Sequence, residues 1–294
     1  MKVKINCLLC ILERGVRAVN LLTEASNEEV LKVAKELLKL LAKEFDFNQV
    51  PSWLGTLRER IIQNTLNNPD IYKKIKDESN KVALELVREI LKDFDFQALN
   101  YENFRKILSL AAAANAMEWF IRGHQFSLHD FRKELSNAYG KLVIDDTNLL
   151  WRDFQNAASI MYILDNAGEA AVDLYVVKYL KKFNKTIFVA AKERPVLNDI
   201  TVREAIELGF QDVADDVVPV GWFVGVFLDK KETNPRFLEL FNSVDLVIAK
   251  GMGAYESLSE YSFRKPVYVI LKAKCDPVAN SLGVPRGSYV VKRL

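Results

Sequence analysis

The stretch that decides the fold reads Ser159-Ile160-Met161-Tyr162-Ile163-Leu164-Asp165-Asn166-Ala167-Gly168-Glu169. An apolar run ends abruptly in a carboxylate and an amide, and a small-residue turn then leads into a helical pattern. This order predicts a strand at 159–164 that delivers Asp165 and Asn166 to the start of a helix. In open α/β sheets that edge binds ligands, and the free N–H groups of a helix N-terminus favour an anion such as phosphate.

The pattern around this stretch predicts an α/β protein with two domains. From residue 145 onward, short apolar runs alternate with amphipathic segments, as in βαβ units. Before about residue 140 the apolar spacing is helical. We therefore expect a helical domain at 1–144 and a Rossmann-like α/β domain at 145–294, with a mostly parallel sheet flanked by helices. The expected strands are 159–164, 185–191, 217–220, 244–249, 266–272 and 288–292.

The composition is that of an ordinary globular protein. The 294 residues are 50% hydrophobic and 27% charged, which is enough to bury a sizeable core. A formal net charge of +2 disfavours nonspecific nucleic-acid binding. No apolar run approaches the length of a membrane span, and three cysteines do not make a secreted disulfide framework. We expect a cytoplasmic protein with no membrane association.

Polar groups follow four of the predicted strands. They are, in chain order, Asp165-Asn166, Asn198-Asp199, Lys250-Gly251-Met252-Gly253, and Lys272 with Lys274. Because the carboxyl ends of parallel strands share one edge, these groups can converge. Two carboxylates and an amide oxygen are suited to Mg²⁺ or Mn²⁺, lysines to a phosphate, and the backbone of Gly251 and Gly253 to close approach by a ligand. The set predicts a metal-dependent phosphoryl site.

Each group has a simpler explanation when it is taken alone. Asp or Asn after a strand is often a turn former or a helix cap, and Asp199 precedes a potential helix. The segment 250–253 matches neither the P-loop nor the dinucleotide-binding glycine pattern. The combination on one edge is what favours a functional site.

Asn115 stands in an otherwise apolar helical segment, 108–119. One interpretation is a buried amide whose hydrogen bonds are satisfied by neighbouring backbone. The other is a residue of the helical domain that reaches the ligand cleft.

Cys7 and Cys10 are three residues apart and would share a helix face. The commonest meaning of such a pair is two half-buried thiols. A structural zinc would need two more ligands, for which the chain offers Cys275, His124 and His129. A redox pair is the third alternative.

Several motifs together resemble the damage-control phosphatase family, in its archaeal-type branch with an N-terminal Cys-x-x-Cys. They are Cys7-x-x-Cys10, Ala114-Asn115 and the segments 165–169, 195–201, 245–258 and 274–279. The resemblance implies a helical domain packed on a Rossmann-like domain. It also implies a divalent metal held by Asp165, Asn166 and Asp199, a substrate site lined by Asp245 to Lys250, and a phosphate contact from Lys274. Members of the family hydrolyse phosphate esters of small, often damaged or surplus, metabolites.

We therefore expect a divalent-metal-dependent phosphomonoesterase that acts on small phosphorylated metabolites and uses Mn²⁺, Mg²⁺, Co²⁺ or Ni²⁺. The assigned residues are, for catalysis, Asp165, Lys250 and Lys274; for substrate binding, Asn115, Gly168, Asp245, Gly251 and Gly253; and for the metal, Asp165, Asn166 and Asp199. Attack by water and attack by Asp165 itself are both compatible with this set. The rival functions are a methyltransferase or nucleotide-binding enzyme on the same sheet, and a noncatalytic metal- or metabolite-binding module.

Overall fold

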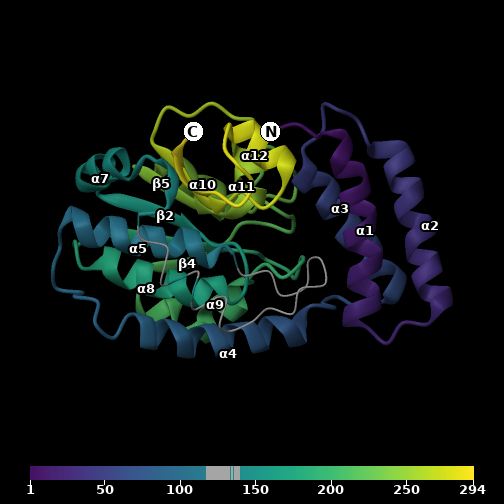
Figure 1. Ribbon diagram of the computed structural model, residues 1–294, viewed down its shortest axis with the longest axis horizontal. Helices are drawn as coiled ribbons and strands as arrows, with labels where there is room; N and C mark the ends of the chain where they lie inside the picture. Colours follow the sequence, from purple (N-terminus) through teal and green to yellow (C-terminus); the bar gives the residue numbers. More distant parts are fainter. Residues whose placement is uncertain (117–132, 134, 136–139) are drawn as a thin grey trace.

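A seven-stranded sheet lies at the centre of the molecule (Figure 1). The structure is a computed structural model that describes residues 1–116, 133, 135 and 140–294. The strand order is β1-β7-β6-β5-β2-β3-β4, and every neighbouring pair is parallel except β6 with β7. The strands are β1 (Leu142–Asp145), β2 (Ser159–Ile163), β3 (Thr186–Ala191), β4 (Asp216–Pro219), β5 (Leu246–Lys250), β6 (Val267–Lys272) and β7 (Tyr289–Arg293). The predicted α/β class is confirmed.

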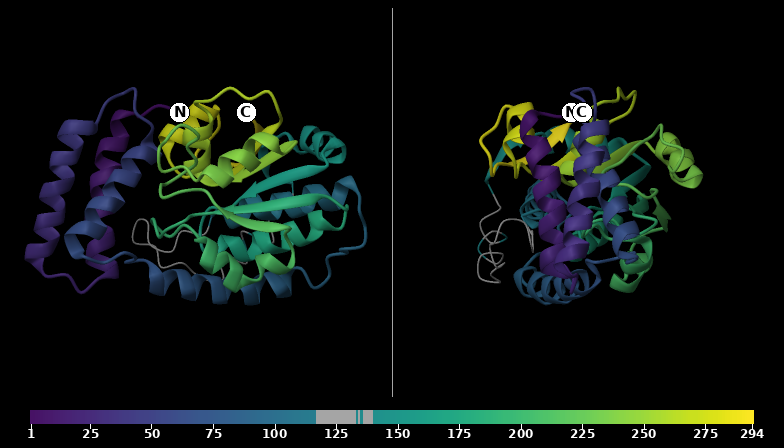
Figure 2. Two further views of the ribbon diagram at one scale, coloured as in Figure 1. Left: turned by 180° about the vertical axis from the view of Figure 1, so that it is seen from behind. Right: turned by 90° about the vertical axis from the view of Figure 1, so that its right-hand side faces the viewer.

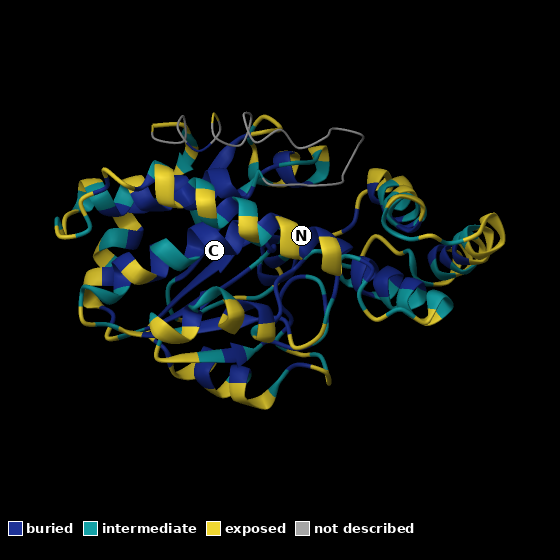
Figure 3. Cartoon of the chain, turned by 90° about the horizontal axis from the view of Figure 1, so that it is seen from below, coloured by how far each residue is buried: buried dark blue, intermediate teal, exposed yellow. Residues whose placement is uncertain are grey.

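Helices cover both faces of the sheet. One face packs against α4 (Lys73–Ile90), α5 (Tyr101–Ala114), α7 (Thr147–Asn156), α8 (Glu169–Lys181) and α9 (Val202–Leu208). The other packs against α10 (Pro235–Ser243), α11 (Gly251–Leu258) and α12 (Asp276–Leu282). Alternate residues of β2 therefore enter different cores, Ile160 and Tyr162 on one side and Met161 and Ile163 on the other. Figure 3 shows the strands buried between helices whose outer faces are exposed.

Three further helices stand at one end of the sheet (Figures 1 and 2). They are α1 (Ile5–Leu22), α2 (Asn27–Glu44) and α3 (Pro51–Leu66). Ser26 caps α2 by accepting a hydrogen bond from the Glu29 N–H, and Pro51 occupies the first turn of α3. The three helices pack on one another through small apolar clusters, and α3 contacts α11 of the α/β part.

The helices of the first half of the sequence therefore lie in two parts of the molecule, on the sheet and at its end. Helices α4 and α5 share a hydrophobic core with the sheet. Among the helices that the structure describes, α1 to α3 form the group that packs mainly on itself. The boundary expected at residue 144 falls inside β1.

Some elements were not expected from the sequence. The short elements β1, α7 and α12 were missed, and β7 runs antiparallel to its neighbour. Part of the helical spacing expected before about residue 140, at 117–132, 134 and 136–139, falls outside the described residues. Within the described ranges, none of the helices combines the length and the apolar character needed to span a membrane.

Candidate active site

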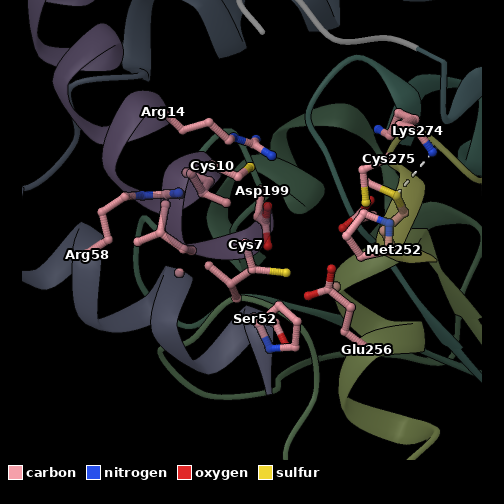
Figure 4. Close-up of a pocket in the computed structure, with 18 of the residues that line it drawn as sticks. Cys7, Cys10, Arg14, Ser52, Arg58, Asp199, Met252, Glu256, Lys274 and Cys275 are labelled. Carbon is pink, nitrogen blue, oxygen red and sulfur yellow. Dashed lines mark hydrogen bonds between the residues drawn. The ribbon is translucent and has the colours of Figure 1, made fainter. Parts of the chain in front are cut away.

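The polar strand ends that the sequence singles out are neighbours in the sheet. Strands β6, β5, β2 and β3 are consecutive and run in the same direction, so their carboxyl ends meet at one edge. The chain leaves β2 toward β3 on one side and reaches β5 on the other, which makes the end of β2 a switch point of the kind that binds ligands. A pocket of about 180 Å³ lies between this edge and helices α1 and α3 (Figure 4).

The backbone fixes the turn after β2 beside the loop after β3. The N–H of Ile200 donates to the carbonyl of Asp165 at 2.9 Å, and Asn166 and Asp199 form an antiparallel bridge. All three predicted metal ligands line the pocket. Their mutual spacing therefore depends on main-chain hydrogen bonds as well as on side-chain rotamers.

Two amide side chains hold the Asp165 carboxylate. Its Oδ2 accepts hydrogen bonds from Nδ2 of Asn115 at 3.1 Å and from Nδ2 of Asn166 at 2.7 Å. The same amides donate to Oε2 of Glu169, at 2.8 Å and 3.0 Å. Burial, together with the negative charges of Glu169 and Asp199, raises the pKa of Asp165 well above its ordinary value. Carboxylates crowded in this way are stabilised by a nearby cation.

Asn115 reaches the site only through its neighbours. It is fully buried, and its Oδ1 accepts a hydrogen bond from the backbone N–H of Lys272 at 3.0 Å. With the two bonds from Nδ2, its amide is satisfied, and it is not one of the described residues that line the pocket. Asn115 therefore positions Asp165, and the structure places it behind the pocket lining and not in it.

The orientation of Asn166 leaves its amide oxygen for a ligand. Because Nδ2 donates to the carboxylates of Asp165 and Glu169, Oδ1 is the polar atom of the side chain that is left to accept. The side chain lines the pocket. This geometry supports the expectation that Asn166 offers oxygen to a cation.

Asp199 carries a buried carboxylate oxygen that has no hydrogen-bond partner among the described residues. The residue is 2% exposed, and the oxygen is Oδ2. Nζ of Lys192 lies 3.5 Å from it at ion-pair distance, and donates its hydrogen bond to the carbonyl of Gly225 at 2.5 Å. Burial raises the pKa of Asp199 to about 6, although the charge of Lys192 opposes this rise. Leaving such an oxygen without a partner costs about 1–3 kcal/mol, so the site favours an added positive ligand.

These observations fit a divalent cation. Asp165 and Asp199 offer carboxylate oxygens and Asn166 an amide oxygen, which are the hard ligands that Mg²⁺ and Mn²⁺ prefer. In the part of the chain that the structure describes, no three His, Cys, Asp or Glu side chains form a metal-holding group by themselves. A cation here would therefore need the amide oxygen, and it would complete its coordination with oxygens of substrate or solvent.

All three cysteines of the sequence line the same pocket. Cys7 and Cys10 share one face of α1, as predicted, and Cys275 precedes α12; all are free thiols. Within the described residues they do not assemble into a zinc site. His124 and His129, the other zinc ligands considered, lie outside those residues. The interpretation as partly buried thiols agrees with the structure.

The structure corrects the role predicted for Lys250. Its ammonium is fully buried against two carboxylates of α8, 3.0 Å from Oδ1 of Asp173 and 2.5 Å from Oε1 of Glu169. Burial alone would lower the pKa of Lys250, but Asp173 and Glu169 raise it, so the group stays charged. Lys250 is not one of the described pocket residues, because the last side chain of β5 faces α8. It therefore positions Glu169 and does not contact a substrate phosphate.

Lys274 is the lysine that reaches the pocket. It follows β6, lines the pocket, and its backbone N–H lies 3.2 Å from Sδ of Met252 (Figure 4). Its charge is one of those that oppose the rise in the pKa of Asp165, which puts it near the metal ligands. Nζ of Lys272, by contrast, lies 5.0 Å from the centre of the Tyr289 ring. Of Lys272, the last residue of β6, and Lys274, the structure favours Lys274 as the phosphate contact.

Two of the three predicted glycines adjoin the site. Gly251 has φ +84°, and a Cβ there would overlap the Asp165 carboxylate, so only glycine lets α11 begin at this point. Gly253 lines the pocket. Gly168 donates its N–H to Oδ1 of Asn80 at 2.6 Å and is not one of the described pocket residues. The structure therefore does not bring Gly168 into the pocket as it brings Gly253.

Asp245 lies at the opposite edge of the sheet, which corrects its assignment to the substrate site. It precedes β5, and its Oδ2 accepts hydrogen bonds from the N–H of Ala158 at 2.9 Å and the N–H of Ser159 at 2.8 Å. At about 3.3 Å per residue, the five residues of β5 separate it from the pocket edge by about 16 Å. Asp245 ties the start of β5 to the start of β2.

Helices α1 and α3 each turn one face toward the pocket. We call the six residues concerned the helical wall: Cys7, Cys10 and Arg14 of α1, and Ser52, Gly55 and Arg58 of α3. Their spacing of three or four residues places each set on one side of its helix. Glu256 of α11 faces the same part of the pocket (Figure 4). Burial raises the pKa of Glu256 to about 7, although the charges of the N-terminal amine, Arg14 and Arg58 oppose the rise.

The family model of the damage-control phosphatase ARMT1-like domain matches residues 3–290. The chain belongs to this family. The chain is similar to an uncharacterised protein of Methanocaldococcus jannaschii, which is 34% identical over 99% of this chain and 95% of that protein. A damage-control phosphatase of Pyrococcus horikoshii is 33% identical over 100% of this chain and 98% of its own, and one of Archaeoglobus fulgidus is 28% identical over 99% of each.

A solved structure supports the same conclusion. The crystal structure of a DUF89 family protein from Pyrococcus horikoshii superimposes with a TM-score of 0.88 and 32% sequence identity, and covers 100% of this chain and 99% of that one. In this member of the damage-control phosphatase family, most of the helical wall was not predicted from the sequence. The signal available was the three- or four-residue spacing of its residues on α1 and α3, and such spacing of polar residues usually marks a face exposed to solvent.

Proposed function

We propose that this protein is a divalent-metal-dependent phosphomonoesterase of the damage-control type, and that its substrates are small phosphorylated metabolites. The observation that carries the proposal is the convergence of Asp165, Asn166, Asp199 and Lys274 on one pocket. Two relatives that match over nearly their whole length are named damage-control phosphatases. The pocket volume of about 180 Å³ suits a small molecule.

The residues divide the work by chemistry. Asp165, Asn166 and Asp199 would hold the cation, which when bound polarises a phosphate oxygen and offsets its charge. Asn115 and Asn166 keep Asp165 in place through their amide hydrogens. Lys274 supplies a positive charge at the pocket, where it would neutralise the charge that spreads over the phosphoryl oxygens in the transition state.

The attacking group is either water or Asp165. A carboxylate in line with phosphorus can act as the nucleophile, and would give an aspartyl phosphate. Rapid-quench experiments with labelled substrate distinguish the routes: a hydroxylamine-sensitive labelled protein shows that Asp165 attacks, and its absence during steady turnover shows that water does.

The proposal is tested by phosphate release from a panel of sugar phosphates, nucleotides and cofactor phosphates with Mn²⁺, Mg²⁺, Co²⁺ or Ni²⁺, with EDTA as the negative control. We expect Asp165→Ala to abolish both turnover and Mn²⁺ binding measured by calorimetry. Asn166→Ala should weaken Mn²⁺ affinity because one ligand is lost. The matched control is Asp245→Asn at the opposite edge, which should retain turnover once folding is verified. Normal turnover of Asp165→Ala contradicts the site assignment.

Two finer statements belong to the same proposal. We also propose that the chain belongs to the archaeal-type branch, which the N-terminal Cys7-x-x-Cys10 and the archaeal origin of the three similar proteins support. Three free thiols suit a reducing compartment, which favours the cytoplasm.

A further inference from the structure

The helical wall contains a buried arginine, Arg58. The contacts of the fold do not by themselves explain why its charge is buried. The side chain of Arg58 is 3% exposed, and its Nε donates to Oε1 of the adjacent Glu59 at 2.7 Å. Buried ion pairs of this kind add little net stability, because desolvation offsets their attraction. A guanidinium has five N–H donors, and this bond uses one of them.

The chain is shaped to let Arg58 reach the pocket. A Cβ at Gly15 would lie 3.0 Å from Cδ and 3.2 Å from Cγ of Arg58 and would meet Leu37 at 2.5 Å, so glycine makes room for the stem of the arginine. Arg14, one residue earlier on α1, also lines the pocket. In Figure 4 both guanidinium groups extend from the side of α1 and α3 toward the pocket.

A hydroxyl of the same wall has no hydrogen-bond partner among the described residues. Oγ of Ser52 is fully buried, and Ser52, at 2% exposure, lines the pocket on α3. An unpartnered buried hydroxyl in a binding pocket is a donor available to a ligand. The wall thus combines this hydroxyl with two groups that bind planar anions in pairs of hydrogen bonds.

These groups lie on a different side of the pocket from Lys274. Figure 4 shows Arg14 and Arg58 on the side of α1 and α3, and Lys274, which follows β6, on the opposite side. Glu256 is the counter-charge on this side, and an incoming anion would compete with it for the arginines. The phosphate held at the metal end therefore leaves the wall for another part of the same substrate.

We propose that the helical wall binds a second acidic group of the substrate, a carboxylate or a further phosphate, through Arg14, Arg58 and Ser52. This inference rests on the proposed phosphatase function and narrows its substrates to phosphate esters with an acidic group at the far end. Glu256 sets a limit on how strongly that group binds.

Three series of esters test the proposal with Mn²⁺ present. They are the ω-carboxyalkyl phosphates, the bisphosphates of the corresponding diols, and the monophosphates of the same diols, each with chains of three to six carbons. We expect the acid-ended esters to exceed the hydroxyl-ended ones in kcat/KM by about tenfold or more at one chain length, as one charged hydrogen-bond pair provides. Preference for carboxylate or for phosphate identifies the second group. Equal kcat/KM values at every length overturn the proposal.

Variants then assign the effect to the wall. Arg14→Gln and Arg58→Lys should each reduce the ratio of acid-ended to hydroxyl-ended kcat/KM by about tenfold. Glu256→Gln should raise that ratio because a competing charge is removed, and a purely structural role would not produce this opposite sign. The control is Arg203→Gln on α9, whose side chain is 86% exposed. A ratio that survives both arginine changes overturns the assignment.

A binding measurement separates this inference from the proposed function. Calorimetry with carboxyl-ended and hydroxyl-ended alkylphosphonates reports the second contact without turnover. The measurement compares wild type with Arg14→Gln, which serves even if Arg58→Lys does not fold. Tighter binding of the carboxyl-ended compound that is lost in Arg14→Gln supports the wall even if no ester is hydrolysed. Hydrolysis without any acid preference leaves the phosphatase intact and refutes the wall.

Discussion

Replacing Glu256 by Gln should stabilise the protein at neutral and alkaline pH. Burial raises the pKa of this carboxyl from 4.5 to about 7, so the folded protein holds its proton over a pH range in which the unfolded chain has lost it. Unfolding is therefore increasingly favoured as pH rises from about 4.5 to about 7. At about 1.4 kcal/mol per pKa unit, the wild-type protein loses about 3 kcal/mol over this range, an upper value because the side chain keeps some contact with solvent.

The assay is urea unfolding of wild type and Glu256→Gln between pH 4.5 and 8.5, in EDTA so that metal binding does not contribute. The difference in free energy of unfolding should be near zero at pH 4.5 and should grow to at most about 3 kcal/mol in favour of the variant above pH 7. Glu239→Gln is the matched control, because that side chain is 69% exposed and its difference should stay small at all pH values. A Glu256→Gln difference that is flat with pH, or that falls as pH rises, would refute this reasoning.

Other perturbations have equally definite outcomes. Lys250→Met leaves two buried carboxylates of α8 without a counter-charge and should lower the urea unfolding free energy by about 3–5 kcal/mol; an unchanged midpoint contradicts the buried network. Gly251→Ala should abolish phosphate release because the added Cβ would overlap the Asp165 carboxylate. Gly140→Ala is the control and should retain phosphate release: Gly140 also has a positive φ, +83°, but no heavy atom of the described residues lies within 4 Å of the added Cβ. Burial raises the pKa of Cys275 to about 12 and that of Cys7 above its usual value, so mass spectrometry should find both thiols unmodified after brief treatment with iodoacetamide at pH 7.5; rapid alkylation of either one contradicts this.

The fold was predictable from sequence where apolar periodicity is strong. Strands that are covered on both faces, such as β2 and β5, are continuous apolar runs, and their order with the intervening helices leads to a parallel sheet. Strand β1 was missed because its burial alternates between half-buried and exposed at the sheet edge, which leaves little apolar signal. The packing of α4 and α5 on the sheet could not be predicted from the sequence either, because an amphipathic pattern shows that a helix has a buried face but not which element covers it.

Some residues of the candidate site were predictable from the sequence and others were not. Residues just after a strand, such as Asp165 and Lys274, are placed by the direction of the strand, and the structure brings them into the pocket. The substrate-binding role predicted for Asp245 was wrong because a residue before a strand lies at the opposite edge of the sheet. The catalytic role predicted for Lys250 was wrong because its side chain binds carboxylates of α8, which are distant in sequence, and so lies in the core instead of the pocket. Arg58 was overlooked since nothing local distinguishes a buried arginine from a solvated one.

The bridge between Asn166 and Asp199 makes the two walls of the pocket separable in evolution. The metal end is built from strand ends and held by backbone bonds of the α/β part, whereas the opposite wall comes from residues 1–66, a contiguous stretch that packs mainly on itself. Exchange of that stretch between relatives could alter which metabolites are accepted without moving any of the proposed metal ligands. Members of the family could in this way differ in substrate through their N-terminal helices, while the strand-end site is kept unchanged.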